Sequence, residues 1–409
     1  MRRRLWALLG ADHLSSTSRR KLGIVAFLYF LEGAPPAILW DILPVYFRIS
    51  GVSLAAIGGL RLLELPYSLK VFWSPLVHRY GDRRTWMCGC LVAVAAAVGL
   101  IPFVEVAHPG WVVFGLVLLL AAASATQDVA IDSYTVGLVD PAEQGAANGI
   151  RASAYRVALV LVGGVLLMFA ALIGWTGLFL TAAALFVALG VGALRVPRLD
   201  LSPEARRAWK AGFLEWVATW RAVPLVLFVL SYKLGEFAIG PMIKPFWVDQ
   251  GRSLFEIGLV PTSIGIGLSV AGALTGGGFI ARFGIFHGVW VLGLLQAASN
   301  LGYAVVAWGD LGRLGLYGAS VFESFTGGLG TAAFLAFLMN VCEKDHATIQ
   351  YAFLSSLFAL TGRLAGALSG LGAERLGYGN YFTLTFFIAL PALALLPWVK
   401  PWIRETPVP

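Results

Sequence analysis

The sequence predicts an all-α integral membrane protein with about twelve transmembrane helices, arranged as two six-helix bundles. Three observations predict this fold. Hydrophobic residues make up 58% of the 409 residues and charged residues only 13%, whereas soluble domains have about 25% charged residues. The apolar residues form runs of roughly 20, which is the length of helix that crosses a bilayer. The two halves of the chain also share a repeated motif.

The apolar runs are separated by turn-forming residues such as Gly81-Asp82, Asp140-Pro141 and Gly309-Asp310. Turn residues of this kind are expected between consecutive helices. The predicted spans are residues 22–46, 53–73, 85–104, 111–137, 148–172, 174–194, 221–247, 253–281, 286–308, 313–341, 349–372 and 378–400.

The charged loops predict the orientation in the membrane, because cytoplasmic loops carry an excess of Lys and Arg. With the N-terminus inside, the loops on the outer side hold only Arg48, Arg252, Arg313 and Arg375 among their basic residues. The sequence therefore predicts a multi-pass protein of a bacterial inner membrane with both termini in the cytoplasm. The net charge of +8 is explained by basic residues in short loops that lie next to the anionic inner leaflet of the membrane. No nucleic-acid partner is therefore expected.

A repeated motif relates the two halves of the chain. The stretch GVSLAAIG at residues 51–58 recurs as GRSLFEIG at residues 251–258, with five of eight positions identical. Each copy lies between the first and second span of its half. Two homologous halves in parallel orientation are typical of a major facilitator fold.

The repeat also predicts how the chain is divided. A polar, helix-prone stretch separates the halves and is expected to be a cytoplasmic linker on the membrane surface. The expected parts are a cytoplasmic N-terminal segment (1–21), an N-terminal bundle (22–194), the linker (195–220), a C-terminal bundle (221–400) and a cytoplasmic tail (401–409).

Several function classes are disfavoured. The sequence has no GxxxxGK[ST] phosphate-binding loop, so an ATP-driven pump is not expected. Its three cysteines and five scattered histidines have neither zinc spacing nor a catalytic constellation. We therefore expect neither an enzyme nor a metal or cofactor site. A secondary transporter is the leading interpretation, and a non-transporting membrane sensor or scaffold is the alternative from another class.

Ionisable side chains within the predicted spans are candidate functional residues, because a charge at the centre of a bilayer costs about 2.5–3.5 kcal/mol on insertion scales. A carboxylate at this depth that takes up and releases a proton would couple transport to the proton gradient. The proton-coupling candidates are Glu32, Glu64, Asp128, Asp132 and Glu236, and the substrate-binding candidates include Arg61, Lys70, Arg151, Arg156, Lys233, Glu323 and Arg363.

Spacing groups these side chains on shared helix faces. Asp128 and Asp132 are four residues apart, and Lys233 and Glu236 are three apart, so each pair faces one way on a helix. Prolines follow Glu32 and Glu236 and predict broken helices, whose freed backbone groups line a cavity or find partners within the protein. An alternative remains open, in which Asp128, Asp132, Arg151 and Arg156 form a salt-bridged belt that holds a gate shut.

Four stretches carry a resemblance to a known family. They are ATQDVAIDSY at residues 125–134, NGIRASAYR at 148–156, LPYSLKVFWSPLVHRYGDRR at 65–84 and ATIQYAFLSSLFAL at 347–360. The sequence resembles AmpG-like permeases of the peptide/acetyl-coenzyme A/drug transporter family. The resemblance implies a twelve-helix major facilitator fold and proton-driven import. It also implies site roles for Gln127, Asp128 and Asp132, for Tyr155 and Arg156, and for Lys70.

The expected substrate is an anionic or amphiphilic small molecule carried with protons across the lipid bilayer. The resemblance implies an anhydromuropeptide-like sugar-peptide first, and a siderophore or an acetyl-coenzyme A-type compound second. Helix one departs from the family pattern, because Glu32 and Asp41 stand where muropeptide permeases are mostly apolar or small. This departure keeps the second group of substrates open.

Overall fold

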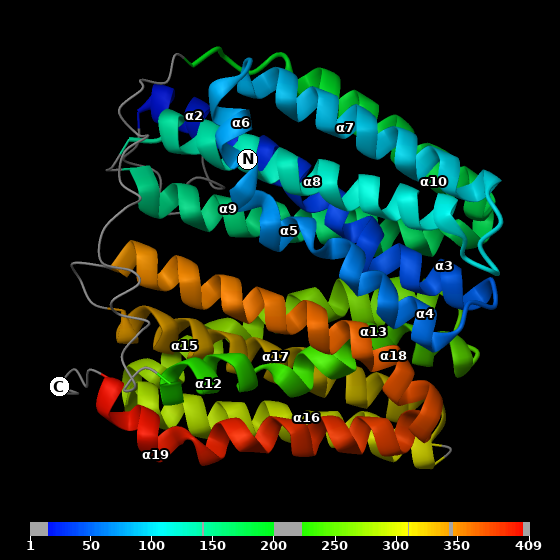
Figure 1. Cartoon of the computed structure of the whole chain (residues 1–409), viewed down its shortest axis with the longest axis vertical. Coiled ribbons are helices and arrows are strands. Elements are labelled where there is room, and N and C mark those ends of the chain that lie inside the picture. The colour runs from blue at the N-terminus through cyan, green and yellow to red at the C-terminus, as the bar shows by residue number, and fades with distance from the viewer. Residues whose placement is uncertain (1–14, 141–142, 200–222, 310, 343–346, 404–409) are drawn as a thin grey trace. The chain divides into compact units, whose positions relative to one another are not determined.

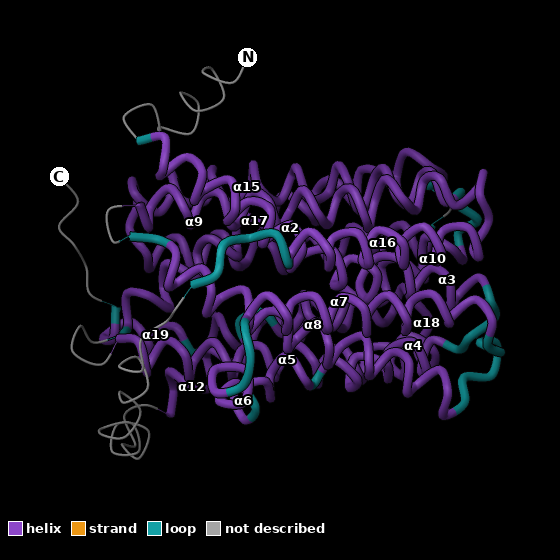
Figure 2. Tube along the Cα trace, turned by 90° about the horizontal axis from the view of Figure 1, so that it is seen from above, coloured by secondary structure: helices purple, strands orange, loops and turns teal. Residues whose placement is uncertain are grey.

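The structure is a computed structural model that describes residues 15–140, 143–199, 223–309, 311–342 and 347–403. The predicted N-terminal segment up to residue 14, the linker from residue 200 and the tail from residue 404 lie outside the described residues. The described chain is helical and contains no strand (Figures 1 and 2). Contacts divide the chain into a first unit, residues 1–46 and 63–203, and a second unit, residues 47–62 and 204–409.

The first unit contains most of the helices of the N-terminal half. In chain order they are α2 (Ser16–Ala37), a π-helical segment (Ile38–Ile42), α3 (Leu43–Ile49), α5 (Pro66–Leu69), α6 (Ser74–Arg79), α7 (Arg83–Leu100), α8 (Trp111–Leu138), α9 (Gln144–Ala158), a second π-helical segment (Leu159–Val165) and α10 (Leu166–Ala193). The boundary between the units cuts α3 after residue 46, so its last residues belong to the second unit.

The second unit contains the helices of the C-terminal half together with α4. They are α4 (Leu54–Gly59), α12 (Val223–Ser231), α13 (Leu234–Asp249), α14 (Leu254–Ile257), a π-helical segment (Gly258–Ile264), α15 (Gly265–His287), a π-helical segment (Gly288–Leu292), α16 (Gly293–Trp308), α17 (Gly312–Val341), α18 (Ala347–Ala394) and α19 (Leu396–Val399).

Twelve membrane spans account for these helices, which confirms the predicted fold class. Eight continuous helical runs of the described chain are long and apolar enough to cross a membrane. Three of them contain a glycine with positive φ in their interior, at Gly174, Gly284 and Gly377, and each of these glycines turns the chain between two spans. Glycine is needed there because it adopts positive φ without steric cost. The twelfth span is the interrupted second helix.

The second span differs from the continuous helix that the sequence predicts. Between residues 54 and 79 it consists of α4, a 3₁₀ segment (Leu60–Glu64), α5, a 3₁₀ turn (Lys70–Phe72) and α6. Pro66 and Pro75 stand in the first turns of α5 and α6. A proline lacks the N–H that would continue the preceding turn. The apolar run alone did not reveal these breaks.

The predicted breaks at prolines in helices one and seven lie elsewhere in the structure. Helix α2 passes through Pro35 and Pro36 and changes to the π-helical segment just after them. Helix α13 passes through Pro241 and Pro245. The seventh span is instead interrupted between Ser231 and Leu234, so the break precedes Glu236 rather than follows it.

The sequence repeat is also a structural repeat. In the first copy the N–H of Gly51 donates to Arg48 O and that of Val52 to Phe47 O, and the same two bonds recur 200 residues later, from Gly251 to Val248 O and from Arg252 to Trp247 O. Ser53 and Ser253 then cap the following helices, as serine commonly does at a helix N-terminus.

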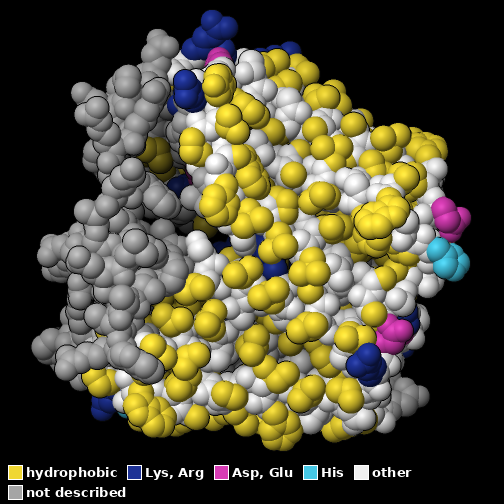
Figure 3. Space-filling model, in the orientation of Figure 1, with side chains coloured by type: hydrophobic (Ala, Val, Ile, Leu, Met, Phe, Trp, Pro, Cys, Tyr) yellow, Lys and Arg dark blue, Asp and Glu magenta, His cyan; other side chains and the backbone are white. Residues whose placement is uncertain are grey.

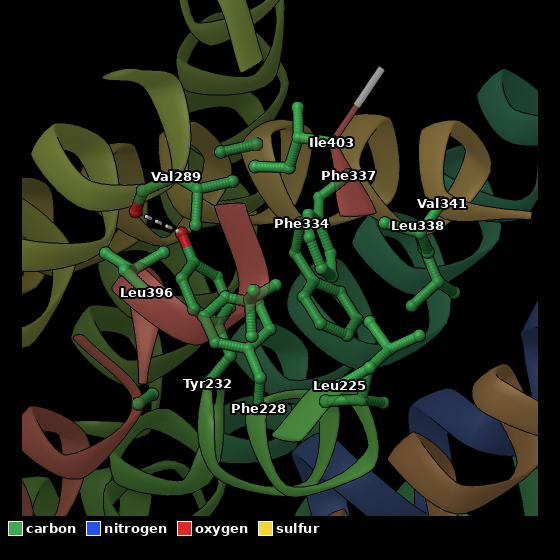
Figure 4. Packing of buried hydrophobic residues seen from close by; sticks show 14 of the residues in the cluster. Leu225, Phe228, Tyr232, Val289, Phe334, Phe337, Leu338, Val341, Leu396 and Ile403 are labelled. Atoms are coloured by element: carbon green, nitrogen blue, oxygen red, sulfur yellow. Dashed lines mark hydrogen bonds between the residues drawn. The ribbon is translucent and has the colours of Figure 1, made fainter. Parts of the chain in front are cut away.

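An apolar cluster lies within the second unit (Figure 4). The rings of Tyr232 and Phe334 stack with centroids 5.3 Å apart. The rings of Phe228 and Phe337 meet edge to face, with centroids 4.8 Å apart. The Tyr232 hydroxyl donates to Val289 O at 3.0 Å, which satisfies the polar end of an otherwise apolar residue. Side chains of α12, α17 and α19 thus join in one cluster.

The surface is strongly apolar. Hydrophobic side chains are spread over the face shown in Figure 3, and few charged side chains are visible among them. Large exposed side chains include Leu172, Leu314 and Leu274, at 80%, 84% and 75% exposure. Contiguous apolar surface of this extent requires lipid around it.

The loop between helices two and three ties the start of the linker to the first unit. Asp82 accepts from the backbone N–H and Nε of Arg84 at 3.1 and 2.8 Å, and this pairing holds the pKa of Asp82 below its usual value. Arg84 Nη1 donates to Leu194 O and Val196 O, at 3.1 and 3.0 Å. The arginine therefore caps the carboxyl end of α10.

Helices α15 and α17 pack so closely at Gly272 that no side chain fits there. A Cβ at Gly272 would overlap Phe325 O, whereas one at Gly277 on the same helix would meet open space. Gly272→Val is therefore expected to destabilise the protein by about 1–3 kcal/mol through overpacking, measured as a lower melting temperature in detergent. Gly277→Val is the matched control. Equal melting temperatures for the two variants would contradict this packing.

Candidate functional site

Charged and polar side chains of four segments meet within the first unit and form what we call the first cluster. Its members are Tyr29 and Glu32 on α2, Lys70 in the 3₁₀ turn, Gln127, Asp128 and Asp132 on α8, and Arg151 on α9. The break in helix two matters here, because Lys70 begins the 3₁₀ turn that follows α5.

The two aspartates of α8 pair with cations from different segments. Lys70 Nζ lies 3.3 Å from Asp128 Oδ2, and Arg151 Nη2 lies 2.9 Å from Asp132 Oδ1. The Tyr29 hydroxyl donates to the same Asp132 oxygen at 2.6 Å, and the Arg151 guanidinium lies 4.3 Å from the centroid of the Tyr29 ring. The spacing of Asp128 and Asp132 thus places them in one cluster with separate partners.

Three oxygen atoms in the first cluster are buried without a hydrogen-bond partner. They are Glu32 Oε2, Gln127 Oε1 and Asp128 Oδ1. Gln127 is fully buried and is held by its Nε2, which donates to Leu31 O at 3.0 Å. A buried unsatisfied oxygen of this kind costs free energy unless a proton, a water molecule or a ligand meets it.

The first cluster holds more negative than positive groups. Glu32 interacts electrostatically with Asp128 and Asp132 and with the two cations, Lys70 and Arg151. Three carboxylates therefore share two cations. In a low-dielectric site such an imbalance is relieved when a carboxylate takes up a proton or a cationic group arrives.

A second cluster lies in the second unit, between α13 and α17. Lys233 is the N-cap residue of α13 and is only 2% exposed. Its ammonium group pairs with Glu236 and also donates to Thr331 Oγ1 at 2.8 Å and to Gly327 O at 3.3 Å. Glu236 stands in the first turn of α13, where the helix dipole favours an acidic side chain.

Glu323 completes the second cluster. A Cβ at Gly327 would lie 4.0 Å from Glu236 Oε1 and 4.0 Å from Glu323 Oε1, so the two carboxylates flank the same glycine. Lys233 interacts electrostatically with Glu323 as well. The second cluster repeats the pattern of the first, in which carboxylates outnumber the cations that pair with them.

The structure shows other contacts for the remaining predicted residues. Glu64 is buried and accepts from Trp40 Nε1 at 3.1 Å. Arg61 and Pro241 both pack against Gly366, and Arg363 Nη1 donates to Ala359 O of its own helix. Tyr155 lies beside the first cluster, since its side chain interacts electrostatically with Asp128 and Glu32. Its backbone touches Gly33, where a Cβ would not fit. The half-buried side chain of Arg156 makes none of the contacts of the first cluster.

A groove elsewhere in the first unit contains none of the predicted site residues. A groove of about 610 Å³ runs between α7 and α8, but it is lined mainly by small and apolar residues such as Gly89, Ala93, Ala122 and Leu119, and by none of the predicted site residues. Within the described ranges, no group of three or more His, Cys, Asp or Glu side chains is placed to hold a metal ion.

Tyr29 and Thr331 are members of the clusters that sequence reasoning missed. Tyr29 lies three residues before Glu32 on α2, so helical spacing had offered a signal for it. Thr331 gave no such signal, because a threonine within an apolar span usually bonds to its own helix. It does so here, to Gly327 O at 2.7 Å, while also accepting from Lys233.

Comparison with known proteins places this arrangement in a family. The family model described as Major Facilitator Superfamily matches residues 22–232, which is more than half of the chain. The chain belongs to the major facilitator superfamily. This membership confirms the fold that the repeat predicted, and it identifies a secondary transporter rather than an enzyme.

Individual relatives agree with this placement over nearly the whole chain. An uncharacterized protein of Haemophilus influenzae is 31% identical, over 94% of this chain and 96% of its own length. The anhydromuropeptide permease of Escherichia coli K12 is 28% identical, over 95% of this chain and 81% of its own length. A putative transporter, AmpG 4 of Rickettsia conorii, is 27% identical over 92% and 95%. The AmpG-like resemblance is therefore confirmed.

Solved structures show the same fold at low sequence identity. A bacterial homolog of the human lysosomal transporter Spinster, in an inward-facing and unoccupied conformation, aligns with a TM-score of 0.77 at 13% identity, over 96% of this chain and 99% of that chain. The nucleoside transporter NupG aligns with a TM-score of 0.68 at 16% identity, over 96% and 100%. At such identities the likeness shows the fold alone.

Proposed function

We propose that this transporter imports an anhydromuropeptide-like sugar-peptide together with protons, by alternating access. The relatives named as an anhydromuropeptide permease and as AmpG transporters support the substrate class. The observation that carries the coupling proposal is the surplus of carboxylates in the first cluster, together with the buried oxygens of Glu32 and Asp128 that have no hydrogen-bond partner.

The proposed roles follow from the contacts of each side chain. Asp128 exchanges a proton, because one of its oxygens pairs with Lys70 and the other is buried and unpartnered. Glu32 supports this exchange as the neighbouring carboxylate. Arg151 recognises an acidic group of the substrate when it parts from Asp132, since a guanidinium binds a carboxylate through two hydrogen bonds.

The second cluster has a parallel role in the proposal. Glu236 and Glu323 form the carboxylate pair, and Lys233 holds Glu236 in place. Six further residues stay candidates for substrate contacts or for coupling, because of their depth in the predicted spans or because of the family resemblance. They are Arg61, Gln127, Tyr155, Arg156, Arg363 and Glu64. The proposed energetics are sufficient, because one proton moving through 100 mV supplies about 2.3 kcal/mol, or roughly fifty-fold accumulation.

Uptake into proteoliposomes tests the proposal. The compounds are an anhydromuropeptide, acetyl-coenzyme A and two siderophores, each with and without an imposed inward proton gradient. We expect gradient-driven uptake of the anhydromuropeptide, which a protonophore abolishes. Uptake of a siderophore or of acetyl-coenzyme A instead would contradict the proposed substrate class. Uptake at the same rate with and without the proton gradient would refute proton coupling.

We also propose that the protein lies in a bacterial inner membrane with both termini cytoplasmic, and that residues 195–220 link two six-helix bundles, 22–194 and 221–400. The distribution of Lys and Arg in the loops supports the orientation. A reporter that is active only outside the cytoplasm is expected to be inactive when fused after residue 409. Activity of that fusion would reverse the proposed orientation.

A further inference from the structure

Three buried polar side chains meet within the second unit, and we call them the polar trio. They are Trp247 on α13, Tyr303 on α16 and Ser320 on α17, with exposed fractions of 0%, 0% and 1%. The Tyr303 hydroxyl lies close enough to Ser320 and to Trp247 to interact with both. Nevertheless Trp247 Nε1, the Tyr303 hydroxyl and Ser320 Oγ each lack a hydrogen-bond partner of normal geometry.

Several other hydroxyl groups within the spans of the second unit are paired with backbone carbonyl groups. The hydroxyls of Tyr232 and Tyr381 each donate to a carbonyl oxygen, at 3.0 and 2.8 Å. Serine and threonine side chains in membrane helices commonly bond to a carbonyl group of their own helix, as Thr326 and Thr331 of α17 do. Ser320 of the same helix makes no such bond. Its hydroxyl is therefore available to a partner outside the helix.

The hydrogen-bonding capacity of the polar trio matches a water molecule. A polar atom that is buried without a hydrogen bond destabilises the fold and is rare in proteins, so three together indicate a group that meets all of them. The indole N–H of Trp247 can only donate, whereas the two hydroxyls can donate or accept. A water molecule accepts from the indole and bonds to both hydroxyls. This makes three hydrogen bonds, which is the usual number for a buried water.

The surroundings of the polar trio favour a ligand as small as water. The Trp247 ring stacks on Tyr317 with ring centroids 5.6 Å apart. The Tyr303 ring meets the rings of Phe246 and Phe382, with centroids 6.2 and 5.8 Å apart. Aromatic rings thus pack around side chains that are themselves almost completely buried. A transported sugar-peptide is too large for such a site, but a single water molecule is not.

We propose that Trp247, Tyr303 and Ser320 bind one water molecule, which joins α13, α16 and α17 by hydrogen bonds. Ser320 lies three residues before Glu323 on α17, so the two side chains share a helix face. Tyr303 also interacts electrostatically with Glu323. The bound water therefore lies on the Glu323 side of the second cluster and adds to the polar surroundings of that carboxylate. The proposal holds for any substrate and does not depend on proton coupling.

Hydroxyl-radical footprinting detects the water directly. A short X-ray pulse splits bound water, the radicals oxidise the side chains that touch it, and mass spectrometry measures the oxidation of each residue. Tyr232 is the matched control, because it is buried in the same unit at 7% exposure and its hydroxyl is already paired with Val289 O (Figure 4). We expect Tyr303 to be oxidised at least about fivefold faster than Tyr232, although it is the less exposed of the two, because only Tyr303 touches a bound water.

Ser320→Ala removes one partner of the water. We expect the oxidation of Tyr303 to fall at least about threefold, because the water loses one of its hydrogen bonds. The melting temperature in detergent is expected to fall as well. Ser299→Ala is the matched control, because Ser299 is also 1% exposed and its hydroxyl bonds to Gln296 O of its own helix. We expect this control to leave both measurements unchanged.

The direction of the stability change distinguishes a filled site from an empty one. Without a water, Ser320→Ala would delete a buried hydroxyl that has no partner, and the melting temperature would rise. A melting temperature that is unchanged or higher in Ser320→Ala would therefore overturn the proposal. Oxidation of Tyr303 at the rate of Tyr232 would also overturn it, as would a rate at Tyr303 that Ser320→Ala leaves unchanged.

Discussion

Asp128→Asn is expected to abolish proton-driven accumulation while leaving the protein folded. The asparagine side chain nearly matches aspartate in shape but cannot take up or release a proton. Lys70, the partner of Asp128, keeps about a third of its side chain exposed, so it stays solvated after the change. Accumulation at 100 mV is expected to fall from roughly fifty-fold to none, because one coupled proton supplies that whole ratio.

The measurement is uptake into proteoliposomes with an imposed proton gradient, together with a melting temperature in detergent. Asp140→Asn is the matched control, because Asp140 is an acidic residue of the same half that is largely exposed and pairs with Lys21. The control is expected to accumulate substrate normally. Normal accumulation by Asp128→Asn would remove Asp128 from the coupling mechanism.

Lys233→Met is expected to cost both stability and transport. Its ammonium group is buried among Glu236, Thr331 Oγ1 and Gly327 O. A methionine would remove this donor from Glu236 and Thr331 Oγ1, while Gly327 O would keep the hydrogen bond from the Thr331 hydroxyl. We expect a loss of about 1–3 kcal/mol, below the value for a wholly buried pair because Glu236 is 30% exposed. We expect uptake to fall at least about tenfold, since a carboxylate of the second cluster is then no longer held in place.

A double variant distinguishes an unpaired charge from lost packing in that experiment. Lys233→Met combined with Glu236→Gln removes both charges, and it is expected to regain most of the melting temperature without regaining proton-driven uptake. A double variant with the same low melting temperature as Lys233→Met would contradict the account, because the loss of stability would then not come from the unpaired charge of Glu236.

The fold was predictable because its signals are local. Apolar length gives the spans, and the motif at residues 51–58 and 251–258 reappears as one turn with the same backbone hydrogen bonds. The interruption of helix two was not predictable from apolar length, which does not distinguish an α-helix from short helices joined by 3₁₀ turns. Pro66 was visible in the sequence, but a proline can also lie within a continuous helix, as Pro241 does.

Pairs along one helix were predictable in the candidate site, and partners across helices were not. The spacing of Lys233 and Glu236 correctly predicted that they meet. The spacing of Asp128 and Asp132 predicted a shared face, but their partners Lys70 and Arg151 come from other segments. Those partners depend on how the helices pack, which spacing within a single helix does not specify.

Coupled movement of substrate and protons is the central claim, and the most direct measurement is the pH inside proteoliposomes that hold a trapped pH-sensitive dye. An anhydromuropeptide is added outside, with no proton gradient imposed. We predict that the interior acidifies as the compound enters, and that Asp128→Asn vesicles show no acidification. Entry of the compound without any change in internal pH would contradict proton coupling.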